Sequence, residues 1–324
     1  MAETPVLVTG AAGFIGSNLV RRLLEEGERV VGVDDLSTGS LANLAPAREQ
    51  RHVGRFEFDL LDVRDPAFVS LVERVRPSVV HHLAAQVDVR VSVEDPIRDA
   101  EVNVLGTLRV LDAARRVDVE RVVYAGSIGS YGEPPEADLP VDERLSSPAL
   151  SPYGASKRAA IEFLATYGEL HGIDHVTLTL ANVYGPHQTT SGEGGVVATF
   201  LGRMLADQPC TIHGDGEQTR DLVFVDDVVD AFVRAGRTGG GTRMLIGTGV
   251  RTSIRDVYEL CARATGYERD PIMAPARAGE VRHSALDASR ARALLGWAPW
   301  TGLEEGIAAT AAWARGRGTS ASGA

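Results

Sequence analysis

Short apolar runs alternate with segments of helical periodicity in the first part of the chain, and this alternation constrains the fold more than any other feature. We expect strands at the runs rich in Val, Leu and Phe, which lie at 5–9, 29–34, 56–60, 78–83, 121–125 and 175–181. Helical patterns lie at 15–26, 66–75, 100–116 and 152–171. Strands that are apolar on both faces are typical of a parallel sheet covered by helices. The alternation therefore predicts an α/β fold with a doubly wound parallel sheet.

The alternation ends after Asn182. Later helical patterns are not regularly interleaved with strands and lie at 196–205, 254–265 and 288–295. We therefore expect a large domain from residues 1–181, with its sheet re-entered around 222–250. Residues 182–221 and 251–315 form a smaller mixed α/β domain. The last residues, 316–324, are small and polar and are expected to be disordered.

Composition excludes several functional classes. The net charge of -11 argues against nucleic acid or an anionic membrane as the main partner. Cys210 and Cys261 do not make a disulfide framework, which favours a cytoplasmic location. No apolar run reaches the ~18 residues that a membrane span needs, and we see no signal peptide.

A glycine motif follows the first expected strand and opens the first expected helix. Gly10, Gly13 and Gly16 in this context predict a dinucleotide site in a Rossmann-type sheet. Gly10 allows the tight turn, Gly13 lets the backbone approach a pyrophosphate, and Gly16 lets the helix pack on the sheet. The amides of Gly13, Phe14 and Ile15 then face a phosphate at the positive end of the helix.

The second expected strand ends at Asp34. A carboxylate there accepts hydrogen bonds from both hydroxyls of an adenosine ribose and repels a 2′-phosphate. No Arg follows directly, and Asp35 adds negative charge, so we expect NAD rather than NADP. The alternative role of a helix cap or turn residue suits Asp35 or Ser37 better than Asp34. Asp59 and Leu60, after the third strand, either border the adenine pocket or form a strand-end turn.

Tyr153 and Lys157 lie one helical turn apart, and Lys157 is the only lysine in the chain. A nearby ammonium lowers the pKa of a phenol and makes it a better base. Lysine is also compact enough to reach a ribose hydroxyl. Alternatively, Lys157 is an ordinary surface residue. Ser127 ends the fifth strand at the edge where ligands bind, so it is either a substrate contact that shares a proton with Tyr153 or a turn residue.

Together these motifs resemble the extended short-chain dehydrogenase/reductase superfamily, and within it the bacterial nucleotide-sugar 4-epimerases of the UDP-glucose/UDP-galactose type. The resemblance covers nearly the whole chain. Its further marks are the segments 34–39, 82–85, 131–132, 182–186, 214–216 and 296–297, together with Asn103, Arg220 and Arg277.

The resemblance implies roles for individual residues. It implies cofactor contacts from the glycine motif, Asp34, Asp59, Leu60, Tyr153 and Lys157, and also from Asp35, Ser37, Thr38, Gly39, Leu83, Ala84, Ala85, Gln86 and Asn103. Ser127, Tyr153 and Lys157 are the implied catalytic residues. Asn182, Arg220 and Arg277 are implied to bind the sugar diphosphate, for which the bidentate guanidinium of arginine is suited. The alternative for the arginines is a surface ion pair, such as Arg220 with Asp221.

The resemblance also implies properties of the sugar pocket and of the assembly. Ser284 falls where related epimerases have a pocket-wall residue, and a small side chain there leaves room for a 2-N-acetyl group. The helices at 100–116 and 152–171 are implied to form a homodimer through a four-helix contact, using small apolar residues such as Ala113, Ala159 and Phe163.

An absence defines the expected reaction. Related dehydratases and decarboxylases carry acidic residues between the positions of Ser127 and Tyr131, where this chain has Ile, Gly and Ser. Without a carboxyl group there, nothing is placed to eliminate water or to assist decarboxylation. We therefore expect NAD-dependent epimerisation at C4 of a UDP-hexose through a 4-keto intermediate. No metal is expected, because His81 and His82 are strand neighbours that point to opposite faces.

Two other functions compete with this one. A UDP-glucuronate 4-epimerase, or another enzyme acting on nucleoside-diphosphate sugars, would have the same fold. The glucuronate enzymes usually have Thr at Asn182 and an Arg near His187, so these residues count against that function. A non-catalytic NAD-sensing protein would tend to lose Tyr153 or Lys157, and this chain has both.

Overall fold

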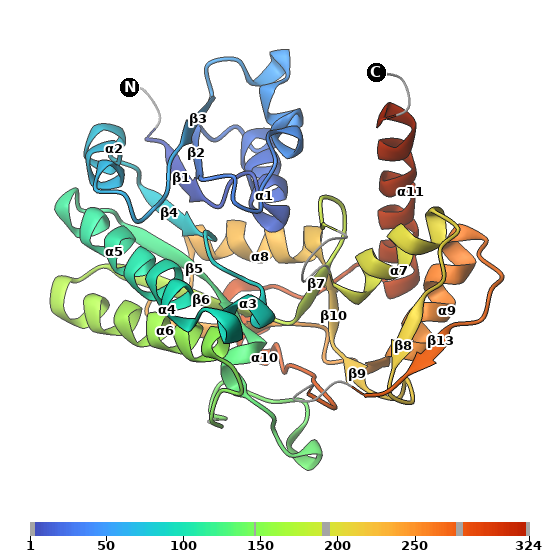
Figure 1. The fold of residues 1–324 in the computed structure, drawn as a ribbon. Coiled ribbons are helices and arrows are strands. Elements are labelled where there is room, and N and C mark those ends of the chain that lie inside the picture. The colour runs from blue at the N-terminus through green and yellow to red at the C-terminus, as the bar shows by residue number, and fades with distance from the viewer. Residues whose placement is uncertain (1–3, 146, 190–194, 277–280, 322–324) are drawn as a thin grey trace.

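The computed structural model describes residues 4–145, 147–189, 195–276 and 281–321 (Figure 1). A seven-stranded sheet forms its centre, with strand order β11-β6-β5-β4-β1-β2-β3 and parallel pairing throughout. The strands are β1 (Val6–Thr9), β2 (Val30–Asp34), β3 (Phe56–Leu60), β4 (Val79–His82), β5 (Arg121–Ser127), β6 (Asp174–Leu180) and β11 (Thr242–Ile246). The predicted α/β doubly wound fold is confirmed. From β1 the strand order extends to one side through β2 and β3 and to the other through β4, β5 and β6. In sheets of this kind, ligands bind at the carboxyl ends of the strands where the order reverses.

Helices cover both faces of the sheet, as Figure 1 shows. On one face lie α1 (Phe14–Glu25) and α8 (Val225–Arg237), which pack against each other. On the other face lie α2 (Ala67–Val75), α5 (Gly106–Arg116) and α6 (Pro152–His171). Short helical segments are η1 (Leu41–Leu44), η2 (Pro46–Arg48), η3 (Gln50–His52), η5 (Ile128–Tyr131) and η6 (Glu136–Asp138). These helices cover the faces of the sheet and not the edge formed by the carboxyl ends of its strands.

The helix predicted at 100–116 is interrupted in the structure. The chain forms α3 (Val89–Glu94), α4 (Pro96–Ala100), a π-helical turn η4 (Glu101–Leu105) and then α5. The π-turn has a wider backbone spacing than an α-helix and directs Asn103 into the protein, where it is buried. Helical periodicity alone does not reveal this interruption.

The remaining elements form a second group on the right of Figure 1. Its strands form two-stranded sheets: β7 (Asn182–Tyr184) with β10 (Leu222–Phe224), β8 (Thr211–His213) with β13 (Ile272–Ala274), and β9 (Thr219–Arg220) with β12 (Thr252–Ser253). Its helices are α7 (Val196–Leu205), α9 (Ile254–Thr265) and α11 (Leu303–Ala321), whereas α10 (Ser289–Leu295) packs against β11 and α8 of the larger part. Within the predicted range 222–250, it is β11 that re-enters the main sheet.

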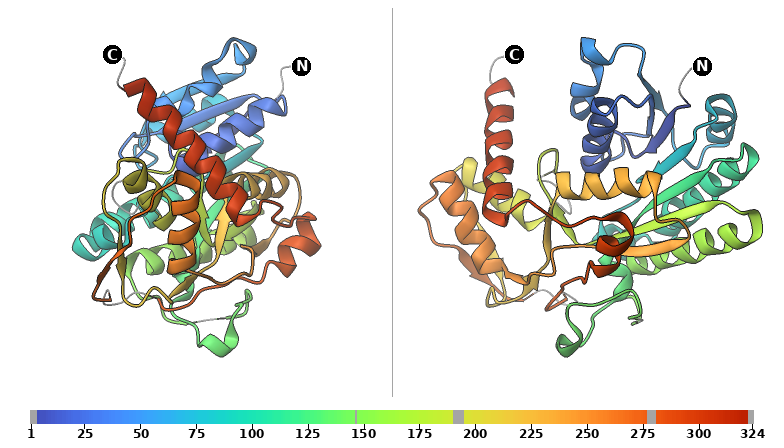
Figure 2. Two further views of the ribbon diagram at one scale, coloured as in Figure 1. Left: turned by 90° about the vertical axis from the view of Figure 1, so that its right-hand side faces the viewer. Right: turned by 180° about the vertical axis from the view of Figure 1, so that it is seen from behind.

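α11 packs against α7 and α9 (Figure 2). The prediction of disorder from residue 316 is wrong for the described part of that segment, because the helix continues to Ala321. Small polar residues suggested a tail, but the helix already formed upstream by packing extends into them. Among the described residues, no helix combines the length and apolarity that crossing a membrane requires.

Candidate active site

A glycine-rich turn joins β1 to α1 at the carboxyl edge of the sheet. Gly10 has a φ of 70°, and a Cβ there would lie 2.8 Å from the backbone nitrogen of Ala84. A Cβ on Gly16 would lie 2.0 Å from the carbonyl oxygen of Gly10, so a side chain would push α1 off the turn. A Cβ on Gly13 would meet only the Gly10 carbonyl, at 3.2 Å. The open space beside Gly13 and the positive end of α1, which begins at Phe14, suit a phosphate.

Asp34 is the last residue of β2 and is buried. Its carboxylate accepts hydrogen bonds from the Ala12 nitrogen at 2.9 Å and the Leu36 nitrogen at 2.8 Å. Burial raises the pKa of Asp34, and the backbone donors act in the opposite direction. The carboxylate therefore holds the glycine turn against β2. Because a carboxylate accepts about four hydrogen bonds, it retains capacity for two ribose hydroxyls.

The segment after β4 lies against the same turn. The backbone nitrogens of Leu83 and Ala84 donate to the carbonyl oxygen and to Oγ1 of Thr9, each at 3.2 Å. The Gln86 nitrogen donates to Asn103 Oδ1 at 2.9 Å, and Asn103 Nδ2 donates to the Gln86 carbonyl at 3.0 Å. Asn103 thus fixes this segment from inside the protein. Direct contact of Gln86 or Asn103 with a cofactor stays a prediction.

Ser127 and Tyr153 approach each other beside Gly129. The Gly129 nitrogen donates to Ser127 Oγ at 3.2 Å. A Cβ on Gly129 would lie 3.4 Å from Ser127 Oγ and 3.6 Å from Tyr153 Cε1, so the hydroxyl and the ring border one small space. Gly154 allows this approach, because a Cβ there would lie 2.3 Å from the Gly129 carbonyl oxygen.

Lys157 follows Tyr153 by one turn of α6 and is buried, with 3% of its surface exposed. Its Nζ donates to the carbonyl oxygen of Ala125 at 3.0 Å and lies 4.8 Å from the ring centre of Tyr124. Burial lowers the pKa of Lys157 to about 8. The alternative of an ordinary surface lysine is therefore wrong.

Three predicted substrate residues meet at β9. Arg220 is half-buried and lies on this strand. The Asn182 nitrogen donates to the carbonyl oxygen of Asp221 at 2.9 Å, and the Ser284 nitrogen donates to that of Thr219 at 3.3 Å. Ser284 is buried, and its Oγ has no hydrogen-bond partner among the described residues. The structure thus brings Asn182, Arg220 and Ser284 together.

Asp221 has a structural role that the sequence did not indicate. Its buried carboxylate accepts from the nitrogen and Oγ1 of Thr248 at 2.8 and 2.7 Å. It also accepts from the nitrogens of Gly249 and Leu286, each at 3.0 Å. Both carboxylate oxygens of Asp221 thus accept hydrogen bonds that join three segments of the chain. Asp221 does not form the local ion pair with Arg220 that was the alternative.

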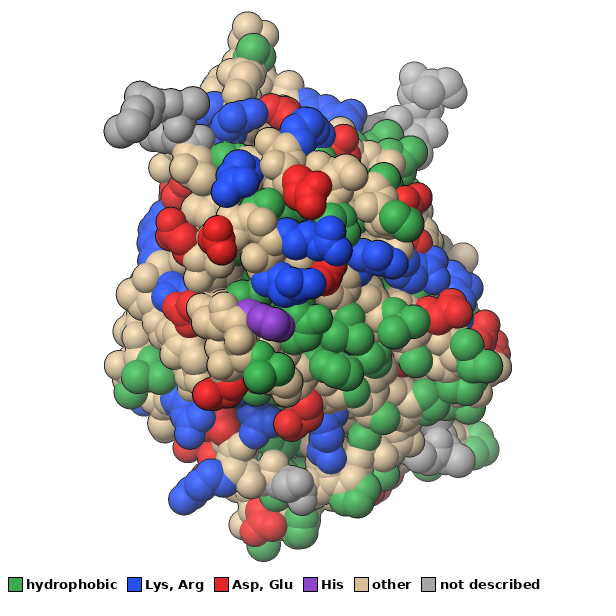
Figure 3. Space-filling view, turned by 90° about the vertical axis from the view of Figure 1, so that its left-hand side faces the viewer, with side chains coloured by type: hydrophobic (Ala, Val, Ile, Leu, Met, Phe, Trp, Pro, Cys, Tyr) green, Lys and Arg blue, Asp and Glu red, His purple; other side chains and the backbone are tan. Residues whose placement is uncertain are grey.

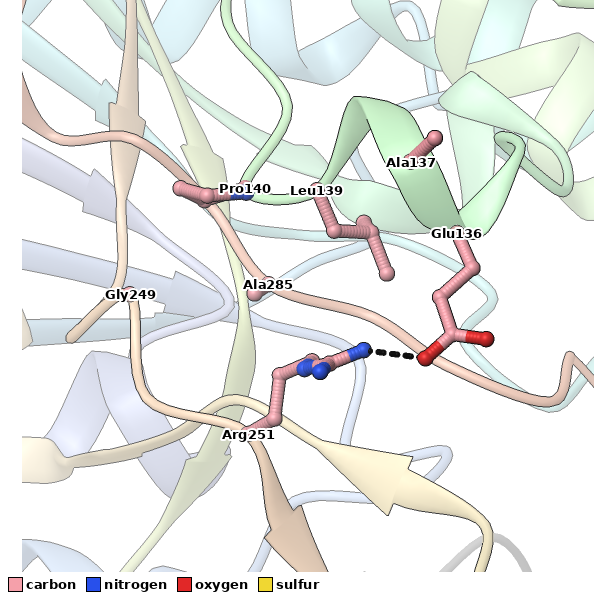
Figure 4. Close-up of a pocket in the computed structure, with 7 residues that line it drawn as sticks. All are labelled: Glu136, Ala137, Leu139, Pro140, Gly249, Arg251 and Ala285. Carbon is pink, nitrogen blue, oxygen red and sulfur yellow. Dashed lines mark hydrogen bonds and ion pairs between the residues drawn. The ribbon is translucent and has the colours of Figure 1, made fainter.

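A cavity of about 520 Å³ lies near this group, as Figure 4 shows. Its lining residues are Glu136, Ala137, Leu139, Pro140, Gly249, Arg251 and Ala285. Arg251 points toward Glu136, with 2.7 Å between Nη1 and Oε1. Ala285 directly follows Ser284, but the predicted catalytic residues are not among those that line the cavity. The cavity therefore adjoins the predicted substrate residues and is not the space between Ser127 and Tyr153.

Comparisons with known proteins agree with this geometry. The model of the NAD dependent epimerase/dehydratase family matches residues 6–247. The chain is 49% identical to a UDP-glucose 4-epimerase of Mycolicibacterium smegmatis, over 94% of this chain and 96% of the relative. The chain belongs to the NAD dependent epimerase/dehydratase family.

Solved structures of similar proteins support the same membership. A UDP-glucose 4-epimerase of Thermotoga maritima, solved with UDP-glucose, has a TM-score of 0.92 and 38% identity, covering 97% of this chain and 99% of that one. A UDP-glucose 4-epimerase of Thermus thermophilus, solved with NAD, has a TM-score of 0.87 and 39% identity, covering 96% and 99%. The predicted family is confirmed, and so is NAD as the cofactor of that family.

The turn after β2 contains further residues predicted to bind the cofactor of this epimerase family. Asp35 and Ser37 are exposed, and Asp35 Oδ1 accepts from the Ser37 nitrogen at 2.9 Å and from its Oγ at 2.6 Å. Thr38 is exposed as well. A Cβ on Gly39 would lie 2.9 Å from Asp34 Oδ1, so Gly39 lets the turn close over that carboxylate. These contacts place the turn beside Asp34.

Contacts with the cofactor or substrate are not defined for three other predicted residues. The Asp59 carboxylate is 3.5 Å from Nη2 of Arg74 on α2, and Leu60 is 65% exposed at the end of β3. Arg277 lies outside the described residues. The adenine and diphosphate contacts assigned to these three residues stay predictions.

His81 and His82 point to opposite faces of the sheet. The His81 ring lies 6.0 Å from the ring of Phe232 on α8, whereas His82 Nδ1 lies 2.8 Å from Oγ1 of Thr9. Burial lowers the pKa of each to about 3. In the part of the chain that the structure describes, no group of three or more His, Cys, Asp or Glu side chains could hold a metal ion.

The sequence reasoning missed a buried polar group next to the predicted catalytic pair. It consists of Asp99 on α4 and Ser156 on α6, joined by a hydrogen bond of 2.5 Å between Ser156 Oγ and Asp99 Oδ2. An Asp in a short segment rich in charged residues gives no local signal of burial. The position of Ser156, between Tyr153 and Lys157, is the one clue in the sequence.

Proposed function

We propose that this protein is an NAD-dependent 4-epimerase of UDP-hexoses, acting on UDP-glucose and UDP-galactose. The observation that carries the proposal is the shared space bordered by Ser127 Oγ and the Tyr153 ring, with the buried ammonium of Lys157 one turn away. The relative with 49% identity bears the name of this activity. A non-catalytic role on the same fold would not require this arrangement.

The residues present suit NAD. Glycines form the turn at the positive end of α1, where a diphosphate is stabilised. Asp34 lies at the end of β2, where it would accept hydrogen bonds from the adenosine ribose. When bound, NAD supplies a nicotinamide that accepts and returns a hydride.

Tyr153 is the proposed acid and base. As a phenolate, it takes the proton from the 4-hydroxyl of the sugar while C4 loses a hydride, which leaves a 4-ketone. Ser127 hydrogen-bonds the same oxygen and shares its proton with Tyr153. After the sugar turns its other face, the hydride returns to C4 and Tyr153 or Ser127 returns the proton. Lys157 favours the phenolate by its charge.

Within the described residues, the turn between Ser127 and Tyr131 carries no acid for a dehydration. The turn η5 carries Ile128, Gly129 and Ser130, and Ser130 Oγ donates to the Ser127 carbonyl at 2.7 Å. The next carboxylates along the chain are paired with other groups. Glu133 accepts from the Arg282 nitrogen at 3.2 Å, and Glu136 pairs with Arg251. This arrangement favours epimerisation over elimination.

We also propose that the N-acetylated substrates are accepted. Ser284 is small and buried, and its hydroxyl has no partner within the described residues. A larger side chain there would fill the space that we assign to the group on C2 of the sugar.

We further propose a homodimer formed through α5 and α6. Ala159 and Phe163 are partly exposed on α6, which fits a contact with a second copy. Ala113 does not fit, because it is fully buried within its own chain, where α5 packs on the sheet. Figure 3 shows this side of the molecule, with hydrophobic side chains gathered beside a band of basic ones.

Incubation with separate substrates tests the proposed function. The purified protein would receive UDP-glucose, UDP-N-acetylglucosamine or UDP-glucuronate, and proton NMR would identify the products. We expect the C4 epimers of the first two. Conversion of UDP-glucuronate alone would favour the competing function, and no conversion of any substrate would contradict both.

A further inference from the structure

Asp99 is a fully buried carboxylate that the proposed mechanism does not yet use. It accepts hydrogen bonds from Gln86 Nε2 at 2.8 Å, Asn103 Nδ2 at 3.2 Å and Ser156 Oγ at 2.5 Å. All three donors are uncharged. Burying a carboxylate is unfavourable unless a cation compensates its charge. Neutral donors reduce this cost only in part, so the surroundings of Asp99 must be examined for a positive charge.

The hydrogen bonds of Ser156 connect Asp99 to the predicted catalytic turn. Ser156 directly precedes Lys157, and its Oγ lies 3.0 Å from the Tyr153 carbonyl oxygen as well as 2.5 Å from Asp99. Lys157 is itself buried, and burial lowers its pKa while the charge of Asp99 raises it. The hydrogen bond from Ser156 thus brings Asp99 to the turn that carries Lys157.

Other groups facing Lys157 do not supply this negative charge. The Tyr124 ring on β5 lies 4.8 Å from Nζ, and burial raises the pKa of the Tyr124 hydroxyl. His82 on β4 is neutral near pH 7, because burial lowers its pKa to about 3. Tyr153, on the same helix, is the group that Lys157 is proposed to activate. Asp99, hydrogen-bonded to the residue that precedes Lys157, is the described carboxylate whose charge raises the Lys157 pKa.

We propose that Asp99 is a positioning residue that keeps Lys157 protonated and, through Ser156, holds the turn that carries Tyr153. This role rests on the proposed function, since it matters for catalysis only if Tyr153 acts as phenolate. Without Asp99, a buried Lys157 would lose its proton at lower pH, and the phenolate would lose the charge that favours it.

The first test is the dependence of kcat on pH for Asp99→Asn, which removes the charge and keeps the shape. We expect a lower kcat and an alkaline limb shifted toward neutral pH by about one unit. Ser156→Ala removes the hydrogen bonds of the Ser156 hydroxyl but keeps the Asp99 charge, so it should lower kcat without this shift. Asp95→Asn, a matched control at the exposed N-cap of α4, should change neither. An equal loss at every pH in Asp99→Asn would show a merely structural role and overturn the proposal.

The second test measures the interaction between Asp99 and Lys157 through protein stability and does not depend on enzymatic activity. Thermal unfolding of Asp99→Asn, Lys157→Met and the double variant forms a cycle. If the two charges compensate each other, the double variant loses less stability than the sum of the single losses. Additive losses would overturn the proposal even if Asp99→Asn is too unstable for kinetics. A wild-type protein without epimerase activity would contradict the proposed function, while the cycle would still decide on the charge pair.

Discussion

At the residue scale, the proposed chemistry depends on Ser127, Tyr153 and Lys157, which lie on β5 and α6. Gly129 and Gly154 have no catalytic group, yet a Cβ on Gly154 would collide with the Gly129 carbonyl oxygen at 2.3 Å, and a Cβ on Gly129 would occupy the space bordered by the Ser127 hydroxyl and the Tyr153 ring. The geometry of the site is therefore set as much by the absence of side chains as by the hydroxyl, phenol and ammonium groups.

Replacing Tyr153 by Phe should lower kcat by about 10²- to 10⁴-fold, because general acid–base catalysis is lost. The ring remains, so NAD should still be retained, as measured by its release on denaturation. Tyr167→Phe is a matched control on the same helix and should have nearly normal turnover. A Tyr153→Phe enzyme with normal turnover would remove Tyr153 from the mechanism.

Replacing Ser284 by Tyr should selectively suppress the reaction of UDP-N-acetylglucosamine. Overfilling a packed site costs about 1–3 kcal/mol, or roughly a ten- to hundredfold loss in kcat/KM. Ser284→Ala should accept both substrates, because the Ser284 hydroxyl has no partner among the described residues. Steady-state kinetics with both substrates would check this. Equal losses, or no effect on either substrate, would refute the pocket-wall assignment.

Single residues could be predicted where one local pattern determines them. The spacing of Tyr153 and Lys157 and the position of Asp34 at a strand end identified those residues from the sequence. Asp99 could not be found in this way, since its burial results from the packing of α4 against α6. The joining role of Asp221 depends likewise on segments that are distant in the chain.

At the element scale, the turn between β1 and α1 combines close packing with an open space for phosphate. The limits of α6 agree with the prediction at both ends, because local signals define them: Ser151 accepts from the Gly154 nitrogen at 3.1 Å, and Gly172 ends the helix with a φ of 68°. The π-turn η4 has no such signal, and the sequence pattern therefore predicted a continuous helix there.

Gly16→Ala should separate α1 from the glycine turn. Its Cβ would lie 2.0 Å from the Gly10 carbonyl oxygen, which requires a backbone shift. We expect a loss of about 1–3 kcal/mol in the free energy of unfolding and a preparation that releases little NAD on denaturation. Gly302→Ala is the control, because a Cβ there would meet nothing within 4 Å. Unchanged stability and NAD content in Gly16→Ala would contradict the proposed packing role.

At the scale of the whole molecule, the smaller group of elements supplies Asn182 and Arg220, whereas Ser127, Tyr153 and the predicted cofactor residues belong to the main sheet and its helices. β6 ends beside β5, with Leu180 opposite Ser127, and the chain reaches Asn182 just beyond. The two parts thus meet at the carboxyl edge. The sequence predicted this division from the end of the strand–helix alternation, but not the small sheets that hold Asn182 and Arg220.

Light scattering should show a particle of twice the chain mass of 34.5 kDa at micromolar concentration. Ala159→Arg should shift this particle toward the monomer, because a buried charge in an apolar contact is unfavourable. Ala165→Arg changes the same residue type on an exposed face of the same helix and should leave the mass unchanged. A wild-type monomer would contradict the proposed dimer.

The most direct test of the whole account follows one hydrogen atom. UDP-glucose carrying deuterium at C4 would be incubated with the purified protein in ordinary water, and NMR and mass spectrometry would locate the label in the product. The account predicts UDP-galactose that keeps the deuterium at C4, since the hydride leaves and returns to the same carbon within a closed site. Loss of the label to water, or no formation of UDP-galactose, would contradict it.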